Sequence, residues 1–271
     1  MSEIYPLVSI ITINLNNAKG LEKTIESIKS QNYKNFEYIV IDGASSDESV
    51  CIIRKNIDLI NIWISEKDRG VYNAMNKGIK LSKGDYLLFL NSGDSFFENS
   101  SLYNLINVSN DNDIVYGNLM NCKNNLNLYT SVYPNKLTFN HFFNDSLPHP
   151  ASLIKKNLFD VFGHYDENYS IVSDWFFFIK VILIHNASYV HVNKIISYFE
   201  LGGFSNNEIH SQKSSKERQF ILKSNFPFLY DDYLSYNQLK KDLFIFNHSR
   251  IIKICMKIIN SKLYKRIVDL F

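Results

Sequence analysis

Cysteine is scarce in this chain of 271 residues. Cys51, Cys122 and Cys255 lie far apart, with neither the spacing of a metal site nor the even number of a disulfide framework. We therefore expect a cytoplasmic location, where thiols stay reduced. The chain also lacks an uncharged run of the roughly 18 to 20 residues that a membrane-spanning helix needs. Residues 1–6 carry no basic run before an apolar stretch, so a signal peptide is not expected.

An excess of charge of one sign is also lacking. The 29 lysines and arginines nearly balance the 27 aspartates and glutamates, which gives a net charge of +2. No nucleic-acid partner is therefore expected, because the chain as a whole offers no basic field. The pattern Gly-x-Gly-x-x-Gly does not follow the first strand, and the Walker A sequence is absent. These absences argue against a dinucleotide-binding enzyme and against ordinary P-loop phosphoryl transfer.

What the sequence does contain is a regular alternation of apolar strands and helices in its first part. Strands are predicted over residues 7–14, 36–42, 60–65 and 87–90, and helices over 18–31, 49–55 and 71–81. This alternation predicts an α/β fold with a mostly parallel sheet flanked by helices. The later part is less regular, with a strand predicted over 113–117, a hairpin over 119–133 and a further strand entered from a turn within 148–154.

Polar residues follow two of the predicted strands. The apolar run over 87–90 stops at Asn91-Ser92-Gly93-Asp94, and Asp42 ends the strand over 36–42. Residues at the carboxyl ends of buried parallel strands lie at the crevice where open α/β sheets bind ligands. We therefore expect both carboxylates at one edge of the sheet. From the residues alone a second interpretation stays open, in which the first group is an ordinary turn and Asp42 is a turn or helix-cap residue.

Four segments, taken together and in this order, resemble the inverting family 2 glycosyltransferases, which have a GT-A fold. They are Thr12-Ile13-Asn14, Ile41-Asp42-Gly43-Ala44-Ser45-Ser46-Asp47, residues 66–78 and Asn91-Ser92-Gly93-Asp94. The resemblance covers most of residues 4–205. It implies transfer of a sugar from a nucleotide diphosphate donor, a UDP-sugar, to a saccharide or lipid-linked acceptor, with Mn²⁺ or Mg²⁺ as cofactor. The implied process is synthesis of a bacterial surface polysaccharide such as O-antigen or capsule.

The resemblance also implies which residues bind the donor. These are Thr12, Asn14, Asp42, Asp68, Arg69, Asn73, Asn76, Asn91, Ser92 and Gly93. Asp68 and Arg69 suit this task chemically, because a carboxylate accepts hydrogen bonds from a base or ribose and a guanidinium pairs with a diphosphate.

The implied metal ligand is Asp94, and here the sequence departs from the family pattern. Most relatives carry Asp-x-Asp or Asp-x-Asp-Asp, whereas in this turn only Asp94 is ionisable. A hard divalent cation takes oxygen ligands, and one carboxylate plus the donor diphosphate can suffice. Metal-independent activity is the alternative.

The helix predicted over 173–180 begins with Ser173-Asp174-Trp175. It matches the place where the family has Glu-Asp before an apolar helix, so Asp174 is the implied general base, with Ser173 in place of the Glu. The alternative is that Ser173 and Asp174 only cap the helix. Further contacts to the phosphates or the acceptor are assigned to His149, Ser173, Trp175, Gly203, Ser205 and His210, although each histidine also has a structural or surface interpretation.

We expect a catalytic domain over residues 1–225, with a nucleotide-binding part over about 1–118 and an acceptor-binding part over about 119–225. A basic amphipathic helical extension is predicted over 226–271. Such an extension either lies on the anionic inner face of the cell membrane or packs on the catalytic domain. Two other functions are retained as alternatives. One is a nucleotidyltransferase. The other is a non-catalytic module that binds sugar nucleotides, which the neutral residues Asn91 and Gly93 in the turn suggest.

Overall fold

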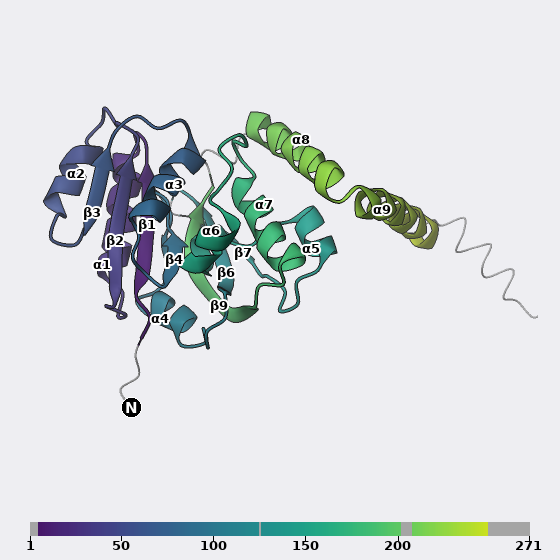
Figure 1. The fold of residues 1–271 in the computed structure, drawn as a ribbon, viewed down its shortest axis with the longest axis horizontal. Helices are drawn as coiled ribbons and strands as arrows, with labels where there is room; N and C mark the ends of the chain where they lie inside the picture. The colour runs from purple at the N-terminus through teal and green to yellow at the C-terminus, as the bar shows by residue number, and fades with distance from the viewer. Residues whose placement is uncertain (1–4, 125, 202–207, 249–271) are drawn as a thin grey trace, which may run out of the picture. The chain divides into compact units, whose positions relative to one another are not determined.

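The computed structural model describes residues 5–124, 126–201 and 208–248 (Figure 1). The chain forms two compact units, residues 1–218 and 219–271. The predicted boundary after residue 225 falls inside the second unit. The predicted division after residue 118 falls inside strand β6 (Ile114–Lys123), which is continuous across it.

The first unit begins with four parallel strands that confirm the predicted α/β fold. They are β1 (Val8–Asn14), β2 (Phe36–Asp42), β3 (Ile62–Ser65) and β4 (Tyr86–Phe89). Their order in the sheet is β3-β2-β1-β4, and Figure 1 shows them side by side in this order from left to right. Strand β4 is buried along its whole length, as its unbroken apolar run predicts.

Three helices connect these strands, namely α1 (Ala18–Lys29), α2 (Ser49–Lys55) and α3 (Val71–Leu81). The buried apolar residues of α1, Leu21, Ile25 and Ile28, recur at helical spacing, and the Asn17 side chain caps its first turn. Helix α3 packs closely on β1, because a Cβ at Gly78 would stand only 2.5 Å from the Ile11 side chain. This close packing fixes the position of α3, which begins at Val71, relative to the sheet.

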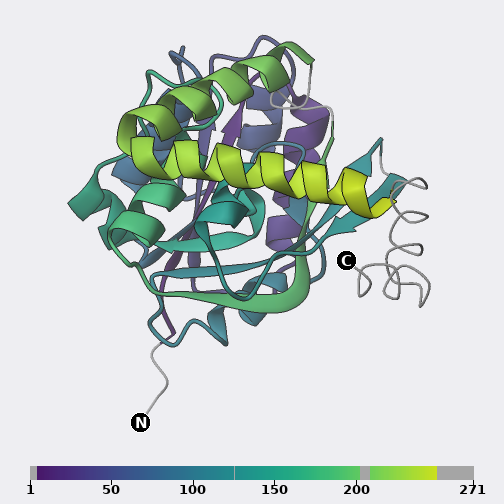
Figure 2. The same ribbon diagram turned by 90° about the vertical axis from the view of Figure 1, so that its right-hand side faces the viewer.

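The later part of the chain extends the same sheet. Its strands are β5 (Ser95–Phe96), β6, β7 (Leu126–Ser131), β8 (Ser152–Lys155) and β9 (Tyr189–Glu200). The full order is β3-β2-β1-β4-β8-β6-β9-β5, with β7 paired to β6 as the predicted hairpin. Strand β9, which the sequence pattern does not predict, runs parallel to β6 and is strongly curved (Figure 2). Their register shifts on both sides of Asn118, as a bent pair of strands requires.

The first unit also contains four shorter helices and a 3₁₀ turn. The helices are α4 (Ser101–Ile106), α5 (Phe139–Asn144), α6 (Lys156–Phe162) and α7 (Ser173–Ile179), and the turn is His149–Ala151. Helix α7 confirms the predicted aromatic helix and continues as a π-helical turn over Lys180–Ile184. Its Trp175, Phe177 and Phe178 are buried, so aromatic packing fixes the position of its first turn.

Helix α8 (Glu208–Asn225) leads into α9 (Pro227–His248). In α9 the acidic Asp231, Asp232 and Asp242 outnumber Lys240 and Lys241. The basic residues expected in the extension therefore fall mainly after His248, outside the described residues. Among the helices that the structure describes, none is both long and apolar enough to cross a bilayer.

Candidate active site

Three polar residues form a row at the carboxyl ends of the parallel strands. Two of them, Asn14 and Asp42, are predicted to bind the donor, and the third is Ser65. Asn14 of β1 lies opposite Asp42 of β2, which lies opposite Ser65 of β3. The turn 91–94 follows β4 at the same edge, where the Ser92 N–H donates to the Ile13 carbonyl at 3.1 Å. This edge is where parallel α/β sheets bind ligands. The tertiary structure thus brings together three of the quoted segments, namely residues 12–14, 41–47 and 91–94.

Asp42 is fully buried and its carboxylate accepts four hydrogen bonds. Oδ1 accepts from Asn14 Nδ2 at 2.8 Å and Ser45 Oγ at 2.5 Å, while Oδ2 accepts from Ser45 N at 2.9 Å and Ser65 Oγ at 2.6 Å. Burial alone raises the pKa of Asp42, but the hydrogen bonds from Ser45, Ser65 and Asn14 outweigh burial and hold the pKa below its ordinary 3.8. Four donors fill the lone pairs of a carboxylate. A direct contact of Asp42 with a ligand would have to replace one of these donors.

Asp42→Asn should destabilise the protein. The new amide group turns an N–H₂ toward donors, so we expect the free energy of unfolding at pH 7 to fall by about 1–3 kcal/mol. Because the pKa of Asp42 in the folded state lies below 3.8, this contribution is fully present above pH 3.8. The difference between parent and variant should shrink only as the pH falls below 3.8. Urea unfolding from pH 7 to pH 3 measures it, with the exposed Asp58→Asn as control; equal stability at pH 7 would contradict the assignment.

Helix α1 holds the turn after β4. The Thr24 hydroxyl accepts from the Gly93 N–H at 3.1 Å and lies 2.6 Å from the Asp94 carbonyl, to which it donates. Asn17 Nδ2 donates to the Ser92 carbonyl at 3.0 Å. Gly93 has φ +107°, a conformation that residues with a Cβ rarely adopt. The glycine that interrupts the acidic family pattern is therefore demanded by the backbone of this turn.

The Asp94 side chain is buried beside Glu200, a residue at the end of β9 that the sequence did not indicate. Oδ1 of Asp94 accepts from the Glu200 N–H at 3.1 Å. Burial raises the pKa of Asp94 to about 7, and the Glu200 N–H and the charge of Lys23 oppose the rise. Lys23 also lies 3.5 Å from the Glu200 carboxylate. A buried carboxylate at this edge would gain from a bound cation.

A second oxygen in the turn is consistent with a cation. Asn91 Oδ1 is buried and forms no hydrogen bond with any described residue. Together with Asp94 it offers the oxygen ligands that Mn²⁺ and Mg²⁺ accept. Within residues 5–124, 126–201 and 208–248, no group of three or more His, Cys, Asp and Glu side chains converges. The donor set therefore fits a cation that takes most of its ligands from phosphates and water.

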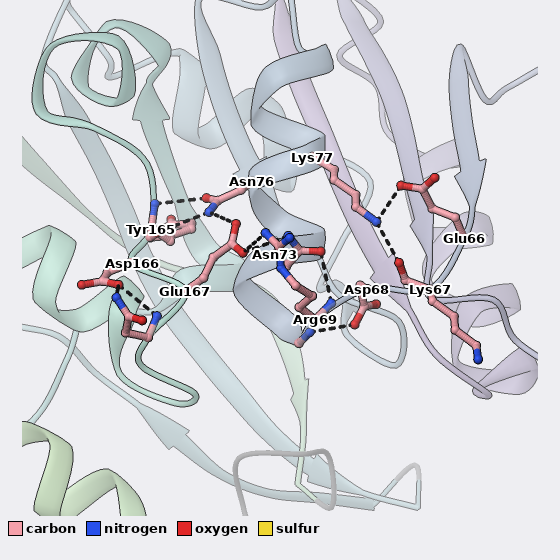
Figure 3. Close-up of polar contacts among 12 residues, drawn as sticks. Glu66, Lys67, Asp68, Arg69, Asn73, Asn76, Lys77, Tyr165, Asp166 and Glu167 are labelled. Atoms are coloured by element: carbon pink, nitrogen blue, oxygen red, sulfur yellow. Dashed lines mark hydrogen bonds and ion pairs between the residues drawn. The ribbon is translucent and has the colours of Figure 1, made fainter.

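The third motif forms the loop before α3 and the first turns of that helix (Figure 3). Asp68 Oδ1 accepts from the Gly70 N–H at 2.9 Å, and the Asp68 carboxylate lies against Gly43, directly after β2. The Arg69 N–H donates to Asn73 Oδ1 at 3.2 Å. These bonds fix the loop between the row at the sheet edge and the start of α3.

Glu167 is a site residue that sequence reasoning missed. Its carboxylate accepts from Arg69 Nη2 at 2.7 Å, from Asn73 Nδ2 at 2.9 Å and from Asn76 Nδ2 at 3.1 Å (Figure 3). Three residues predicted to bind the donor thus converge on one acidic side chain from a distant segment. Nothing in the local sequence around Glu167 signals this role.

Two predicted donor-binding residues are buried and engaged with the protein itself. The Asn76 amide exchanges two hydrogen bonds with the Tyr165 backbone, of 2.9 and 3.1 Å. Thr12 Oγ1 donates to the Leu90 carbonyl at 2.7 Å and accepts from the Tyr38 hydroxyl at 3.1 Å. Both residues support the walls of the site, and their contact with the donor stays a prediction.

Asp174 lies in the first turn of α7 and is half-buried against α3. Its Oδ1 accepts from the Tyr72 hydroxyl at 2.6 Å. Among the described residues, no hydrogen bond reaches its other carboxylate oxygen. Burial and the charge of Asp174 raise the pKa of Tyr72 well above its ordinary value, so this phenol is a stable donor. This arrangement is compatible with the general-base role that the resemblance implies for Asp174.

The residues around Asp174 are aromatic and buried. Trp175 Nε1 donates to the Phe142 carbonyl at 2.7 Å, and the Arg218 guanidinium lies 4.8 Å from the centre of the Trp175 ring. The Ser173 hydroxyl is buried and has no hydrogen-bond partner among the described residues. A ligand at the first turn of α7 would reach this hydroxyl only after the side chains around it rearrange.

His149 has the contacts of a structural residue. Its Nε2 lies 2.8 Å from the Tyr165 hydroxyl, and its ring stacks on Phe89 with centroids 4.6 Å apart. Burial lowers the pKa of His149, so the ring is neutral at pH 7. These contacts favour the structural interpretation over a phosphate contact. Gly203 and Ser205 lie outside the described residues, and so does the side chain of His210.

One open cavity of about 710 Å³ lies at the other edge of the sheet, beside the first residues of β4 and the last residue of β8. Its two lysines are already paired: Lys155 lies 2.7 Å from Asp111 and 3.5 Å from Asp113, and Lys156 lies 3.3 Å from Asp160. This cavity carries no free charge for an anionic ligand. The candidate active site is the carboxyl edge, where Asn14, Asp42 and the turn 91–94 lie.

The chain resembles known proteins in sequence over most of its length. The sequence profile described as Glycosyl transferase family 2 matches residues 9–165. The chain is 32% identical over 217 residues to a PGL/p-HBAD biosynthesis glycosyltransferase of Mycobacterium bovis, a match that covers 76% of this chain and 82% of that protein. It is 30% identical over 228 residues to an uncharacterized glycosyltransferase of Mycobacterium tuberculosis, covering 82% of this chain and 86% of that one.

Solved structures share the fold at low identity. Staphylococcus aureus TarS 1-349 in complex with UDP-GlcNAc superposes with a TM-score of 0.61 at 20% identity and covers 73% of this chain. The mannosyltransferase PcManGT from Pyrobaculum calidifontis, in complex with GDP-Man and Mn²⁺, gives 0.57 at 15% identity and covers 75%. This chain spans 60% of the TarS chain and 59% of the PcManGT chain. These likenesses show that the fold is GT-A-like.

The profile match includes all four quoted segments in full, from Thr12 to Asp94. The relatives share most of their length with this chain at identities of 30% or more. The order of the motifs, the GT-A-like fold and these matches agree, and the chain belongs to glycosyltransferase family 2.

Proposed function

We propose that the protein is an inverting hexosyltransferase. It transfers a sugar from a UDP-sugar to a saccharide or lipid-linked acceptor during synthesis of a bacterial surface polysaccharide such as O-antigen or capsule. The observation that carries this proposal is the half-buried Asp174, one oxygen of which is held by Tyr72 of α3 while the loop before α3 carries Asp68 and Arg69. The UDP-GlcNAc bound to the GT-A-like neighbour TarS supports the choice of nucleotide.

The residues at the sheet edge are assigned to the donor. Asn14, Asp42 and Asp68 would bind or shape the base and ribose end, and Arg69 would pair with the diphosphate. Asp94, with Asn91 Oδ1, would hold Mn²⁺ or Mg²⁺. When bound, such a cation neutralises charge on the leaving diphosphate. The turn 91–94 keeps these two oxygens in place through its bonds to α1.

Asp174 is assigned to the acceptor. An acceptor hydroxyl loses its proton to the Asp174 carboxylate as its oxygen forms a bond to the anomeric carbon. The bond from that carbon to the diphosphate oxygen breaks in the same step, and the electron pair leaves with the nucleoside diphosphate. Attack from the face opposite the leaving group inverts the anomeric configuration. The Tyr72 hydroxyl keeps the carboxylate oriented, because it donates to Oδ1 and does not occupy the other oxygen.

A thermal-shift screen followed by product analysis tests the proposal. A ligand that binds only the folded state raises the melting temperature, so UDP-sugars should raise it more than GDP-, dTDP- or CMP-sugars in the presence of Mn²⁺. Incubation with acceptors should then release UDP. Release of pyrophosphate would instead indicate a nucleotidyltransferase, and binding without turnover would indicate a non-catalytic module. Either outcome would overturn the proposed function.

We further propose that the basic segment after α9 binds an anionic membrane surface, which would bring the enzyme to a lipid-linked acceptor. Each Lys or Arg near such a surface contributes about 1 kcal/mol. Changing Lys253, Lys257 and Lys265 to Glu should therefore weaken binding to anionic liposomes by on the order of 100-fold at low salt. The effect should be smaller at high salt, because salt screens exposed charges.

A matched control for this prediction changes the same number of lysines elsewhere. Lys19, Lys34 and Lys55 are exposed in the first unit. Changing these three to Glu alters the net charge equally but should leave liposome binding close to that of the parent. If the parent sediments with neither anionic nor neutral liposomes, the membrane proposal is wrong.

A further inference from the structure

The Arg69–Glu167 ion pair links two segments that are far apart in sequence. Arg69 comes from the loop before α3, and Glu167 from the segment between α6 and α7 (Figure 3). The Arg69 Nη2 and Glu167 Oε2 atoms are 2.7 Å apart. The arginine side chain is 79% exposed, whereas that of Glu167 is 31% exposed. The carboxylate is thus the more enclosed partner, and the guanidinium extends from it into solvent.

Two side chains of α3 hold the Glu167 carboxylate in place. Asn73 and Asn76 donate to its two oxygens, and Asn76 also fixes the backbone two residues earlier, at Tyr165. The hydrogen bond from Arg69, together with those from Asn76 and Asn73, holds the pKa of Glu167 below its ordinary value. The carboxylate is therefore ionised at neutral pH and does not depend on Arg69 alone for its position.

The guanidinium retains most of its hydrogen-bonding capacity in this arrangement. A guanidinium has five N–H donors in a rigid fork. The bond to Glu167 uses Nη2, and no other side-chain hydrogen bond of Arg69 is found among the described residues. An exposed arginine normally loses rotamer freedom when it binds an anion, and that loss weakens binding. An arginine that is already anchored at one edge has less freedom to lose.

We infer that Glu167 is a positioning residue for the donor diphosphate: it fixes the Arg69 guanidinium by one edge and leaves the other N–H groups to pair with the phosphates. This inference rests on the proposed function, because it takes Arg69 as the diphosphate ligand. The inference also assigns Asn73 and Asn76 a role other than direct contact with the donor, because both residues orient Glu167. The segment Asp68–Asn76 would then act as one unit with the carboxylate at its centre.

Glu167 could instead weaken the binding of the donor, which is the opposite of the effect that a positioning role predicts. A carboxylate near the phosphates repels them, and a Glu167 that merely competed with the donor for Arg69 would weaken donor binding. Removing its charge would then tighten UDP binding. The positioning role predicts weaker UDP binding on the same substitution, so the sign of the change decides between the two.

The experiment measures the affinities of UDP and uridine by calorimetry for the parent, Glu167→Gln and Glu66→Gln. Glu66 is the matched control, because it forms an equally short ion pair of 2.7 Å with Lys77 of α3 and does not contact Arg69 (Figure 3). Glu167→Gln should weaken UDP binding roughly tenfold, within the range for residues in direct contact. Uridine has no phosphate, so its affinity should stay unchanged. Glu66→Gln should bind both ligands as the parent does.

A second variant keeps the inference testable if Glu167→Gln fails to fold. Asn73→Ala removes one of the donors that hold Glu167, together with the acceptor of the Arg69 N–H, and keeps both partners of the Arg69–Glu167 ion pair. It should weaken UDP binding by a smaller factor, again without changing uridine binding. In an Arg69→Gln background, Glu167→Gln should cause no further loss, because there is no guanidinium left to position.

Three results would overturn the inference. Tighter UDP binding by Glu167→Gln would show competition, equal losses for UDP and uridine would show general structural support, and unchanged UDP affinity would show no role. A parent protein that binds neither UDP nor a UDP-sugar would instead refute the proposed function itself. The two failures are therefore distinguishable by the behaviour of the parent.

Discussion

Asp174→Asn should lower turnover by roughly 10²- to 10⁴-fold, the range expected when a general base is removed. The substitution preserves the shape of the side chain and its contact with Tyr72, which donates to Oδ1 at 2.6 Å. It removes the negative charge that takes up the acceptor proton. The affinity for UDP should barely change, because Asp174 is assigned to the acceptor and not to the nucleotide. Release of UDP at saturating donor and acceptor, together with calorimetry for UDP, measures both quantities.

Tyr72→Phe is the companion variant, since it removes only the hydroxyl that orients the base. Turnover should fall by a smaller factor, about tenfold, because the carboxylate remains but is less well held. Retained turnover in Asp174→Asn would overturn the assignment. So would a product with the donor's own anomeric configuration, because Asp174 is proposed to activate a hydroxyl that attacks from the opposite face.

Asp94→Asn should abolish the Mn²⁺-dependent part of donor binding while leaving the fold intact. Asn91 Oδ1 and the new amide oxygen are neutral, so no charged protein oxygen would remain in the turn to hold the cation beside the diphosphate. Calorimetry of UDP with and without Mn²⁺ measures the effect. The control is Glu98→Gln, an exposed carboxylate shortly after the turn, which should keep the full metal dependence. Activity of the parent that is fully retained in EDTA would contradict a metal role.

The same residue predicts how metal binding depends on pH. Burial raises the pKa of Asp94 to about 7, so protons compete with the cation below that value. Mn²⁺ affinity should fall about tenfold per unit of pH below 7 and level off above it. The effect on folding has the opposite sign: ionising this buried carboxyl destabilises the metal-free protein as the pH rises from 3.8 to 7. Asp94→Asn should therefore be at least as stable as the metal-free parent at pH 8.

The sequence by itself determined the first half of the fold and the residues at its edge. The elements β2, α2 and α3 span the residues that apolar periodicity predicts, and β1, β4 and α1 differ only at their ends. These elements pack through repeats of two or about 3.6 residues, which local sequence records. The placement of Asp42 and Asp94 at one edge follows as well, because parallel strands end on the same side.

Only the tertiary structure decided which partners these residues have. Glu167 reaches Arg69 from 98 positions along the chain, Tyr72 reaches Asp174 from 102, and the Glu200 N–H reaches Asp94 from 106. A single polar side chain has no periodicity, so nothing in its neighbourhood indicates which distant group it will meet. Strand β9 was hidden for a related reason, since its residues are only partly buried and its pairing depends on the bent β6. Local sequence fixes where a strand or helix begins, whereas packing of the whole chain fixes which side chains share a site.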